Sequence, residues 1–205
     1  MIKNVVFDIG NVLMTFQPVV YFNSYFQDEE KTMRLCKQIF ADDAWAKYDQ
    51  GILFMEDLKE YYTKTYPGDK EDLLYILDHW LELMRPIPEA FQLMQDLRTE
   101  GYGIYLLSNI SKDSADYLKA TQPFFGYADG AVLSYEEKIN KPDHRIFQIL
   151  LERYDLKAEE TLFLDDNLPN VKAAKCRGIH ALQVVSVSSM VHKVTRILKE
   201  RGQEC

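Results

Sequence analysis

Three acidic residues stand where carboxylate chemistry is expected. Asp8 follows the apolar residues 5–7, and Asp165 and Asp166 follow the apolar residues 162–164. A short apolar run bounded by polar residues is typical of a buried strand, so each carboxylate is expected at a strand end. If these strands are neighbours, three carboxylates converge, and like charges so close need a compensating cation to stay ionised. An all-oxygen cluster suits a hard divalent cation such as Mg2+.

Two further polar sites supply complementary groups. Ser108 and Asn109 follow the apolar residues 104–107 and offer a hydroxyl and an amide to phosphate oxygens, while Lys141 adds positive charge. A cation, an ammonium group and neutral donors around carboxylates favour phosphoryl transfer. One carboxylate would attack phosphorus and carry it as an aspartyl-phosphate. Each residue alone has an ordinary explanation, such as helix capping by residues 165–167, but their shared placement favours the catalytic one.

The elements that must position these residues alternate from residue 88 onward. Strands are expected at 103–107, 131–133, 161–164 and 181–185, and helices at 88–100, 112–120, 143–154, 169–177 and 190–200. With a first strand at residues 3–9, this alternation predicts a Rossmann-like α/β core, a parallel sheet with helices on both faces. All the polar clusters then lie at the carboxyl ends of strands, where such sheets bind ligands.

Residues 15–87 have a different character. Apolar residues recur there at three- and four-residue spacing, as in Leu73, Ile76, Leu77 and Trp80, which predicts helices. We therefore expect a core domain of residues 1–14 and 88–205, interrupted by a small all-helical cap domain of residues 15–87. Aromatic residues are abundant in the insert. They are interpreted as its core rather than as sugar-stacking platforms; the candidates for stacking are Tyr21, Trp45, Tyr48 and Trp80.

Composition limits the classes of partner and location. The chain has 205 residues, a net charge of -8 and no Lys/Arg run, which argues against nucleic-acid binding. No apolar run approaches ~20 residues, so no membrane span is expected. Three widely spaced cysteines (Cys36, Cys176 and Cys205) favour a reducing, cytoplasmic location, and Cys176 is interpreted as a core residue. We expect a monomer or a weak homodimer.

The polar clusters belong to four segments: Asp8-Ile9-Gly10-Asn11-Val12, Ser108-Asn109, Asn140-Lys141-Pro142-Asp143 and Asp165-Asp166-Asn167. In order and spacing, these segments resemble the four motifs of the haloacid dehalogenase superfamily. The resemblance covers the whole chain, and the helical insert after the first motif is similar to a cap of this superfamily. Four ordered motifs make the resemblance specific.

The resemblance implies a role for each residue. Asp8 would be the nucleophile and a ligand of Mg2+, and the backbone carbonyl of Gly10 would be a second ligand. Asp166 would bind the metal directly, whereas Asp165 would bind it or orient its waters. The substrate would be a small phosphorylated metabolite. Its phosphoryl group would be held by Ser108, Asn109 and Lys141, and Lys141 would also offset the charge of Asp8.

The sequence departs from the usual phosphatase pattern at Gly10. Most phosphatases of the superfamily carry a second aspartate there as general acid and base, a group worth roughly 10²–10⁴-fold in rate. Three explanations are open: a cap residue replaces it, the leaving group hardly needs a proton, or activity is residual. The Asp-x-Gly-Asn-Val form resembles a subgroup that includes glucose 1-phosphate phosphatases, and an anomeric leaving group fits a missing acid.

Two other functions are weighed against the phosphatase. A 2-haloacid dehalogenase also lacks the second aspartate, but it needs no metal and usually has uncharged residues in place of Asp165 and Asp166. A non-catalytic phospho-ligand-binding regulatory protein would tolerate Gly10, yet it would need none of Asp8, Lys141 and Asp166. The sequence therefore favours a Mg2+-dependent phosphatase acting through Asp8.

Overall fold

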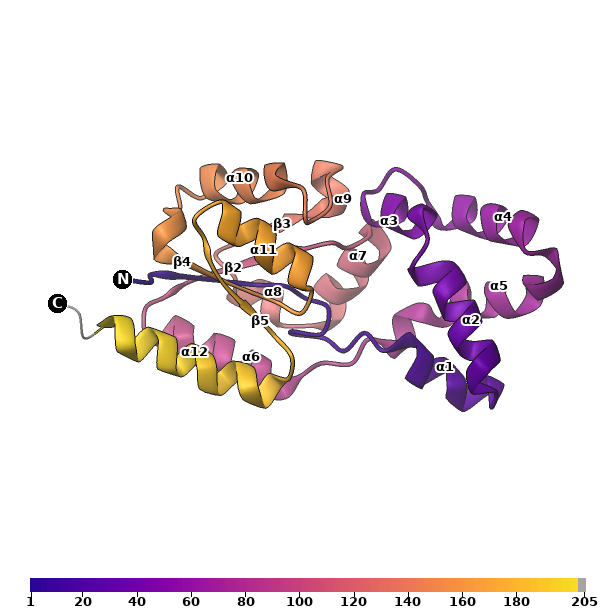
Figure 1. Ribbon diagram of the computed structural model, residues 1–205, viewed down its shortest axis with the longest axis horizontal. Coiled ribbons are helices and arrows are strands. Elements are labelled where there is room, and N and C mark those ends of the chain that lie inside the picture. The colour runs from indigo at the N-terminus through magenta and orange to yellow at the C-terminus, as the bar shows by residue number, and fades with distance from the viewer. Residues whose placement is uncertain (203–205) are drawn as a thin grey trace.

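A computed structural model describes the backbone of residues 1–202 and the side chains of residues 1–198. Its centre is a parallel five-stranded sheet in the order β3-β2-β1-β4-β5 (Figure 1). This is the α/β architecture that the sequence predicts. The strands are β1 (Asn4–Phe7), β2 (Gly103–Ser108), β3 (Gly130–Leu133), β4 (Thr161–Asp165) and β5 (His180–Gln183).

Strand β1 lies in the middle of the sheet. It pairs with β2 on one side and β4 on the other, and Phe7 is in register with both Leu106 and Leu164. Val5, Val6 and Phe7 are fully buried, as expected for a strand covered on both faces. The register brings the residues after Phe7, Leu106 and Leu164 to one edge of the sheet.

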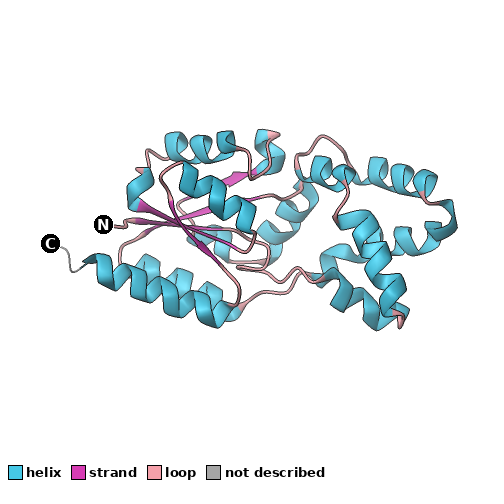
Figure 2. Cartoon of the chain, viewed as in Figure 1, coloured by secondary structure: helices cyan, strands magenta, loops and turns pink. Residues whose placement is uncertain are grey.

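Helices cover both faces of the sheet, as Figure 2 shows. One face packs against α10 (His144–Arg153) and α11 (Leu168–Cys176), through a cluster that includes Val6, Phe147 and Phe163. The opposite face packs against other helices, and its cluster includes Val5 and Phe7. Those helices are α6 (Pro88–Thr99), α7 (Lys112–Thr121) and α12 (Val187–Gly202).

A second group of helices, here called the helical bundle, occupies residues 18–83 at the end of the molecule away from the termini (Figure 1). Every element there is helical, as predicted. The chain crosses to the bundle and back along adjacent paths, because the backbone N–H of Thr15 donates to Arg85 O and that of Ile87 to Leu13 O. The helices are α1 (Pro18–Phe26), α2 (Glu29–Phe40), α3 (Asp43–Asp49), α4 (Met55–Thr65) and α5 (Lys70–His79), with 3-10 turns at Pro67–Asp69 and Trp80–Leu83.

Some details differ from the predictions. The structure adds two short helices, α8 (Phe124–Tyr127) and α9 (Ser134–Glu137), and a 3-10 turn at Ala158–Glu160. Cys176 is exposed, so the prediction that it lies in the core was wrong. On α11 the buried side includes Ala174, and a residue two positions further along a helix lies on the opposite side. Cys205 lies outside the described residues. Within residues 1–202, no helix is both long and apolar enough to span a membrane.

Candidate active site

Three strand ends deliver the predicted carboxylates and hydroxyl to one place. Asp8 follows β1, Ser108 ends β2 and Asp165 ends β4, and these strands are neighbours. One carboxylate oxygen from each of Asp8, Asp165 and Asp166 lies within 4.8 Å of the others. The structure therefore brings together the three acidic residues that the sequence places at strand ends.

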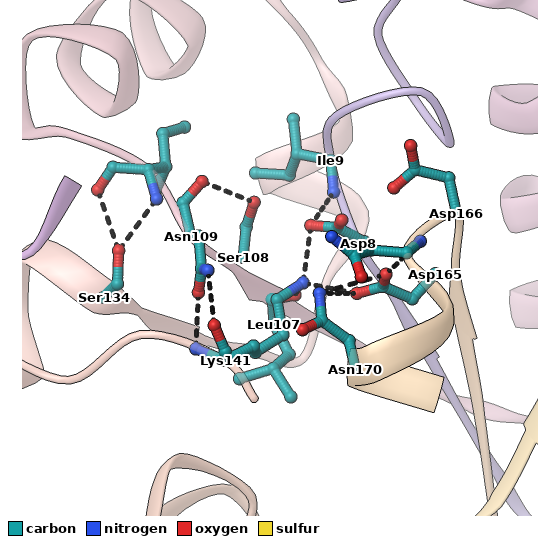
Figure 3. Close-up of polar contacts among 12 residues, drawn as sticks. Asp8, Ile9, Leu107, Ser108, Asn109, Ser134, Lys141, Asp165, Asp166 and Asn170 are labelled. Carbon is teal, nitrogen blue, oxygen red and sulfur yellow. Dashed lines mark hydrogen bonds and ion pairs between the residues drawn. The ribbon is translucent and has the colours of Figure 1, made fainter. Parts of the chain in front are cut away.

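Lys141 lies between two of these carboxylates (Figure 3). Its Nζ is 2.9 Å from Asp8 Oδ1 and 2.7 Å from Asp165 Oδ2, and it donates to Leu107 O at 2.9 Å. Its side chain is almost completely buried. Burial disfavours the ammonium group, but the two carboxylates outweigh it and raise the pKa of Lys141. Lys141 is therefore a fixed positive charge beside Asp8.

Asn109 holds the backbone that carries Lys141. Its Oδ1 accepts from Lys141 N at 2.7 Å, and its Nδ2 donates to Lys141 O at 2.9 Å. Both halves of the amide are thus occupied by the protein. Ser108 is buried and lines a cavity together with Asp8 and Asn109. Ser108 Oγ makes only a long contact, 3.5 Å, with Asn109 O, and the Asn109 amide has a second N–H, so both residues have a donor at this cavity.

The two adjacent aspartates have different surroundings. Asp165 is fully buried, and its two oxygens accept from Lys141 Nζ, Asn167 N and Asn170 Nδ2. Asp166 is only half-buried and lines the cavity, where its Oδ2 accepts from Asn11 Nδ2 at 2.9 Å. Burial raises the pKa of Asp166, and the nearby charge of Asp165 adds to this. Asp165 therefore has its oxygens hydrogen-bonded within the protein, whereas Asp166 faces the cavity.

Asp8 is oriented from its own backbone as well as by Lys141. Its Oδ1 accepts from Ile9 N at 2.7 Å. Burial raises the pKa of Asp8 to about 7, and Lys141 opposes this shift while the charge of Asp165 reinforces it. Three carboxylates thus face one ammonium group, which leaves an excess of negative charge. A divalent cation with oxygen ligands fits that excess and the chemistry of these donors.

Gly10 and Asn11 form the turn after Asp8. Gly10 does not need to be glycine: its φ is not in the left-handed region, and nothing lies within 4 Å of the position of a Cβ. Asn11 makes the left-handed turn instead, with φ 53°, and its Oδ1 accepts from Phe16 N at 2.9 Å. The sequence predicts no role for Asn11 or Asn170. The tolerance of Asn for left-handed φ was the available signal for Asn11.

The cavity above Asp8 has a volume of about 220 Å³. Its floor is the sheet edge, including Gly10, Ser108 and Asp166, and its opposite wall comes largely from the helical bundle. Of the four aromatic candidates, Trp45 and Trp80 line it, with ring centroids 5.0 Å apart. The other two have partners elsewhere, since Tyr21 Oη donates to Glu82 and Tyr48 Oη to Asp113. The bundle contributes Trp45, Asp49 and Trp80, and the segments that connect it to the sheet contribute Phe16 and Met84.

Comparison with known proteins decides the family. The sequence profile of haloacid dehalogenase-like hydrolases matches residues 2–178. The chain belongs to this family. A sesquiterpene phosphatase of Aspergillus oryzae is 25% identical over 182 residues, covering 89% of each chain. A D-ribitol-5-phosphate phosphatase of Bacteroides thetaiotaomicron is 26% identical, covering 97% of this chain and 99% of its own. This haloacid dehalogenase-like hydrolase thus has phosphatases among its relatives.

Solved structures share the fold. A family enzyme of Bacteroides thetaiotaomicron, in complex with magnesium and inorganic phosphate, has a TM-score of 0.67 at 24% identity over 89% of this chain and 94% of its own. An L-2-haloacid dehalogenase of Xanthobacter autotrophicus, with chloropropionic acid covalently bound, has a TM-score of 0.68 at 22% identity over 90% and 78%. At these identities the likeness concerns the fold alone.

Proposed function

We propose that this hydrolase is a Mg2+-dependent phosphatase that releases phosphate from a small phosphorylated metabolite through an aspartyl-phosphate on Asp8. One observation carries the proposal: a buried lysine bridges Asp8 and Asp165 while a third carboxylate, Asp166, faces the same cavity. Displacement of halide from carbon needs no metal, so it gives no reason to gather three carboxylates. Phosphoryl transfer with a bound divalent cation does require such a cluster, because the carboxylates are the ligands of the cation.

The oxygen atoms around the cavity differ in how available they are as ligands of Mg2+. Asp8, Asp166 and the backbone carbonyl of Gly10 would hold Mg2+, since all three residues line the cavity. Asp165 would orient Lys141 and the loop of Asn167, because its oxygens already accept from both. When bound, the metal would neutralise charge on the transferring phosphoryl group.

The side chains of the protein would perform the remaining steps. The contacts of Lys141 and Ile9 N fix Asp8 Oδ1, which leaves the carboxylate oriented toward phosphorus. Ser108 would donate to a phosphoryl oxygen, and Asn109 would act by keeping Lys141 in place. Attack by the carboxylate on phosphorus forms the Asp8–phosphorus bond and breaks the bond to the leaving oxygen. Water then hydrolyses the aspartyl-phosphate.

The cavity favours a small substrate with both polar and apolar surface. Trp45, Trp80 and Met84 offer apolar contacts opposite the carboxylates. A sugar phosphate such as glucose 1-phosphate has hydroxyl groups and apolar ring faces, and both fit such a lining. Residues 15–87 would act as a cap that excludes water from a core made of residues 1–14 and 88–205. Monomeric or weakly dimeric protein would suffice, because the whole cavity comes from one chain.

A substrate panel tests this function. Phosphorylated sugars, polyols, isoprenoid alcohols and acids would be assayed for phosphate release with Mg2+, with excess chelator, and after Mg2+ is restored. We expect release that chelator abolishes and Mg2+ restores. Full activity in chelator would remove the metal role. Halide release from 2-chloropropionate in chelator would establish the dehalogenase instead.

A further inference from the structure

A carboxylate of the helical bundle faces the reaction cavity. Asp49 is the last residue of α3, is half-buried, and lines the same cavity as Asp8 and Gly10. Among the residues that line this cavity, all of them described by the structure, the titratable side chains are Asp8, Asp49 and Asp166. Asp8 and Asp166 already have roles in the proposed function, so Asp49 is the acid without one.

Hydrogen bonds from residues 134–140, which follow β3, hold the end of α3 and thereby position Asp49 at the cavity. Ser134 Oγ donates to Asp49 O at 2.6 Å, Lys138 Nζ to Gly51 O at 2.8 Å, and Asn140 Nδ2 to Ala46 O at 2.8 Å. Figure 1 shows α3 beside α9, from which Ser134 comes. A group held by such contacts is preorganised for contact with a substrate.

The surroundings of Asp49 suit proton transfer near neutral pH. Burial, with a smaller contribution from the charge of Asp8, raises the pKa of Asp49 to about 7 against the opposing effect of a hydrogen bond from the backbone of Ser111. Asp166 lines the same cavity as Asp49. An adjoining cavity, which Asp49 also lines, has the charged side chains Lys141, Asp42, Asp43 and Asp143. A general acid and base is most effective with a pKa near the working pH.

We propose that Asp49 is the general acid and base that Gly10 cannot provide. This inference rests on the proposed phosphatase function. As Asp8 attacks phosphorus, the bond to the leaving oxygen breaks, and that oxygen takes the proton of Asp49 to leave as a neutral alcohol. The Asp49 carboxylate then takes a proton from water as the water oxygen attacks the aspartyl-phosphate. The Asp8–phosphorus bond breaks, inorganic phosphate is released, and both aspartates return to their starting states.

The variant Asp49→Asn tests this role. An alkyl phosphate needs a proton on its leaving oxygen, whereas p-nitrophenyl phosphate does not. We expect turnover of the most active alkyl phosphate of the panel to fall by roughly 10²–10⁴-fold. With p-nitrophenyl phosphate, the variant should release about one equivalent of nitrophenol per active site and then slow, because water is no longer activated. Asp43→Asn, the same change at an exposed position of α3, should behave as wild type.

A variant at Gly10 keeps the role of Asp49 testable if Asp49→Asn does not fold. The double variant Asp49→Asn/Gly10→Asp should turn over the alkyl phosphate at least tenfold faster than Asp49→Asn alone, since a side chain at position 10 has open space. Gly10→Asp alone should give alkyl phosphates no selective gain over p-nitrophenyl phosphate, because wild type already has its acid. A hundredfold gain confined to the alkyl phosphates would overturn the role of Asp49, whether or not Asp49→Asn folds. Alkyl turnover within threefold of wild type in a folded Asp49→Asn protein would overturn it too. Absence of phosphate release by wild type would remove the phosphatase function and this role together.

Discussion

The sheet edge and the helical bundle differ in where their ion pairs lie: those of the sheet edge are buried, whereas bundle pairs such as Lys64–Glu60 are exposed. At the sheet edge, Lys141, Asp8 and Asp165 have side chains no more than 10% exposed and depend on one another. In the bundle, ion pairs such as Lys64–Glu60 lie at the surface, where the side chains are 74% and 66% exposed. Surface pairs contribute little, whereas a buried charge that loses its partner is costly. The charged residues of the sheet edge are therefore intolerant of substitution, whereas the exposed ion pairs of the bundle contribute little to stability.

The largest expected effect concerns the nucleophile. Asp8→Asn should lower turnover of every phosphate substrate by several decades, because an amide of the same shape does not attack phosphorus. The fold should persist, since the substitution removes a charge without changing packing. Turnover and the thermal midpoint would be measured together. Turnover within about tenfold of wild type would remove Asp8 from the nucleophile role.

The next effect tests how strongly the charges of the sheet edge depend on one another. Lys141→Met should abolish turnover and lower the free energy of unfolding by about 3–5 kcal/mol at pH 8 in chelator, since Asp8 and Asp165 lose their buried partner. The loss should shrink at pH 5. Burial raises the pKa of Asp8 in the folded protein, so lower pH neutralises that carboxyl and relieves the repulsion.

Denaturant unfolding at both pH values would measure this dependence. Lys172→Met, at an exposed position of α11, is the matched control and should leave stability unchanged at either pH. A loss for Lys141→Met that is the same at pH 5 and pH 8 would contradict the electrostatic explanation.

A smaller effect is expected where the bundle touches the sheet region. Tyr48 is buried, and its Oη donates to Asp113 Oδ2 at 2.6 Å across that boundary. Tyr48→Phe should cost about 1 kcal/mol of unfolding free energy. It should also lower kcat/KM a few-fold, because α3 would be held less firmly over the site. Unchanged kinetics with reduced stability would show that this contact is structural only.

The smallest effect belongs to the bundle surface. Lys64→Ala removes the pair with Glu60 and should change the free energy of unfolding by less than about 0.5 kcal/mol, with turnover unaffected. Denaturant unfolding of this variant beside Lys141→Met gives the comparison directly. Similar losses from both substitutions would erase the distinction between the two regions.

The same contrast explains what could be predicted from the sequence. Asp8 and Asp165 end strands, and parallel strands place their carboxyl ends at one edge, so their meeting follows from local patterns. Asp49 ends a helix, and nothing in the pattern of a helix states which surface it will dock on. Asp49 accepts from Ser134, and the neighbouring Ala46 and Gly51 accept from Asn140 and Lys138, so α3 is held by tertiary contacts. The two bonds from Asn109 to Lys141 span 32 residues and are likewise invisible to local patterns.

The central position of β1 has a consequence for synthesis of the chain. β1 leaves the ribosome first, yet its partners β2 and β4 begin at Gly103 and Thr161. At about 5–20 residues per second, the first partner arrives only after a delay on the order of several seconds. Throughout that delay the apolar residues Val5, Val6 and Phe7 have no strand beside them. The helical bundle, residues 18–83, is translated in full during this time, so all of its residues are available to pack with one another before β2 and β4 reach β1.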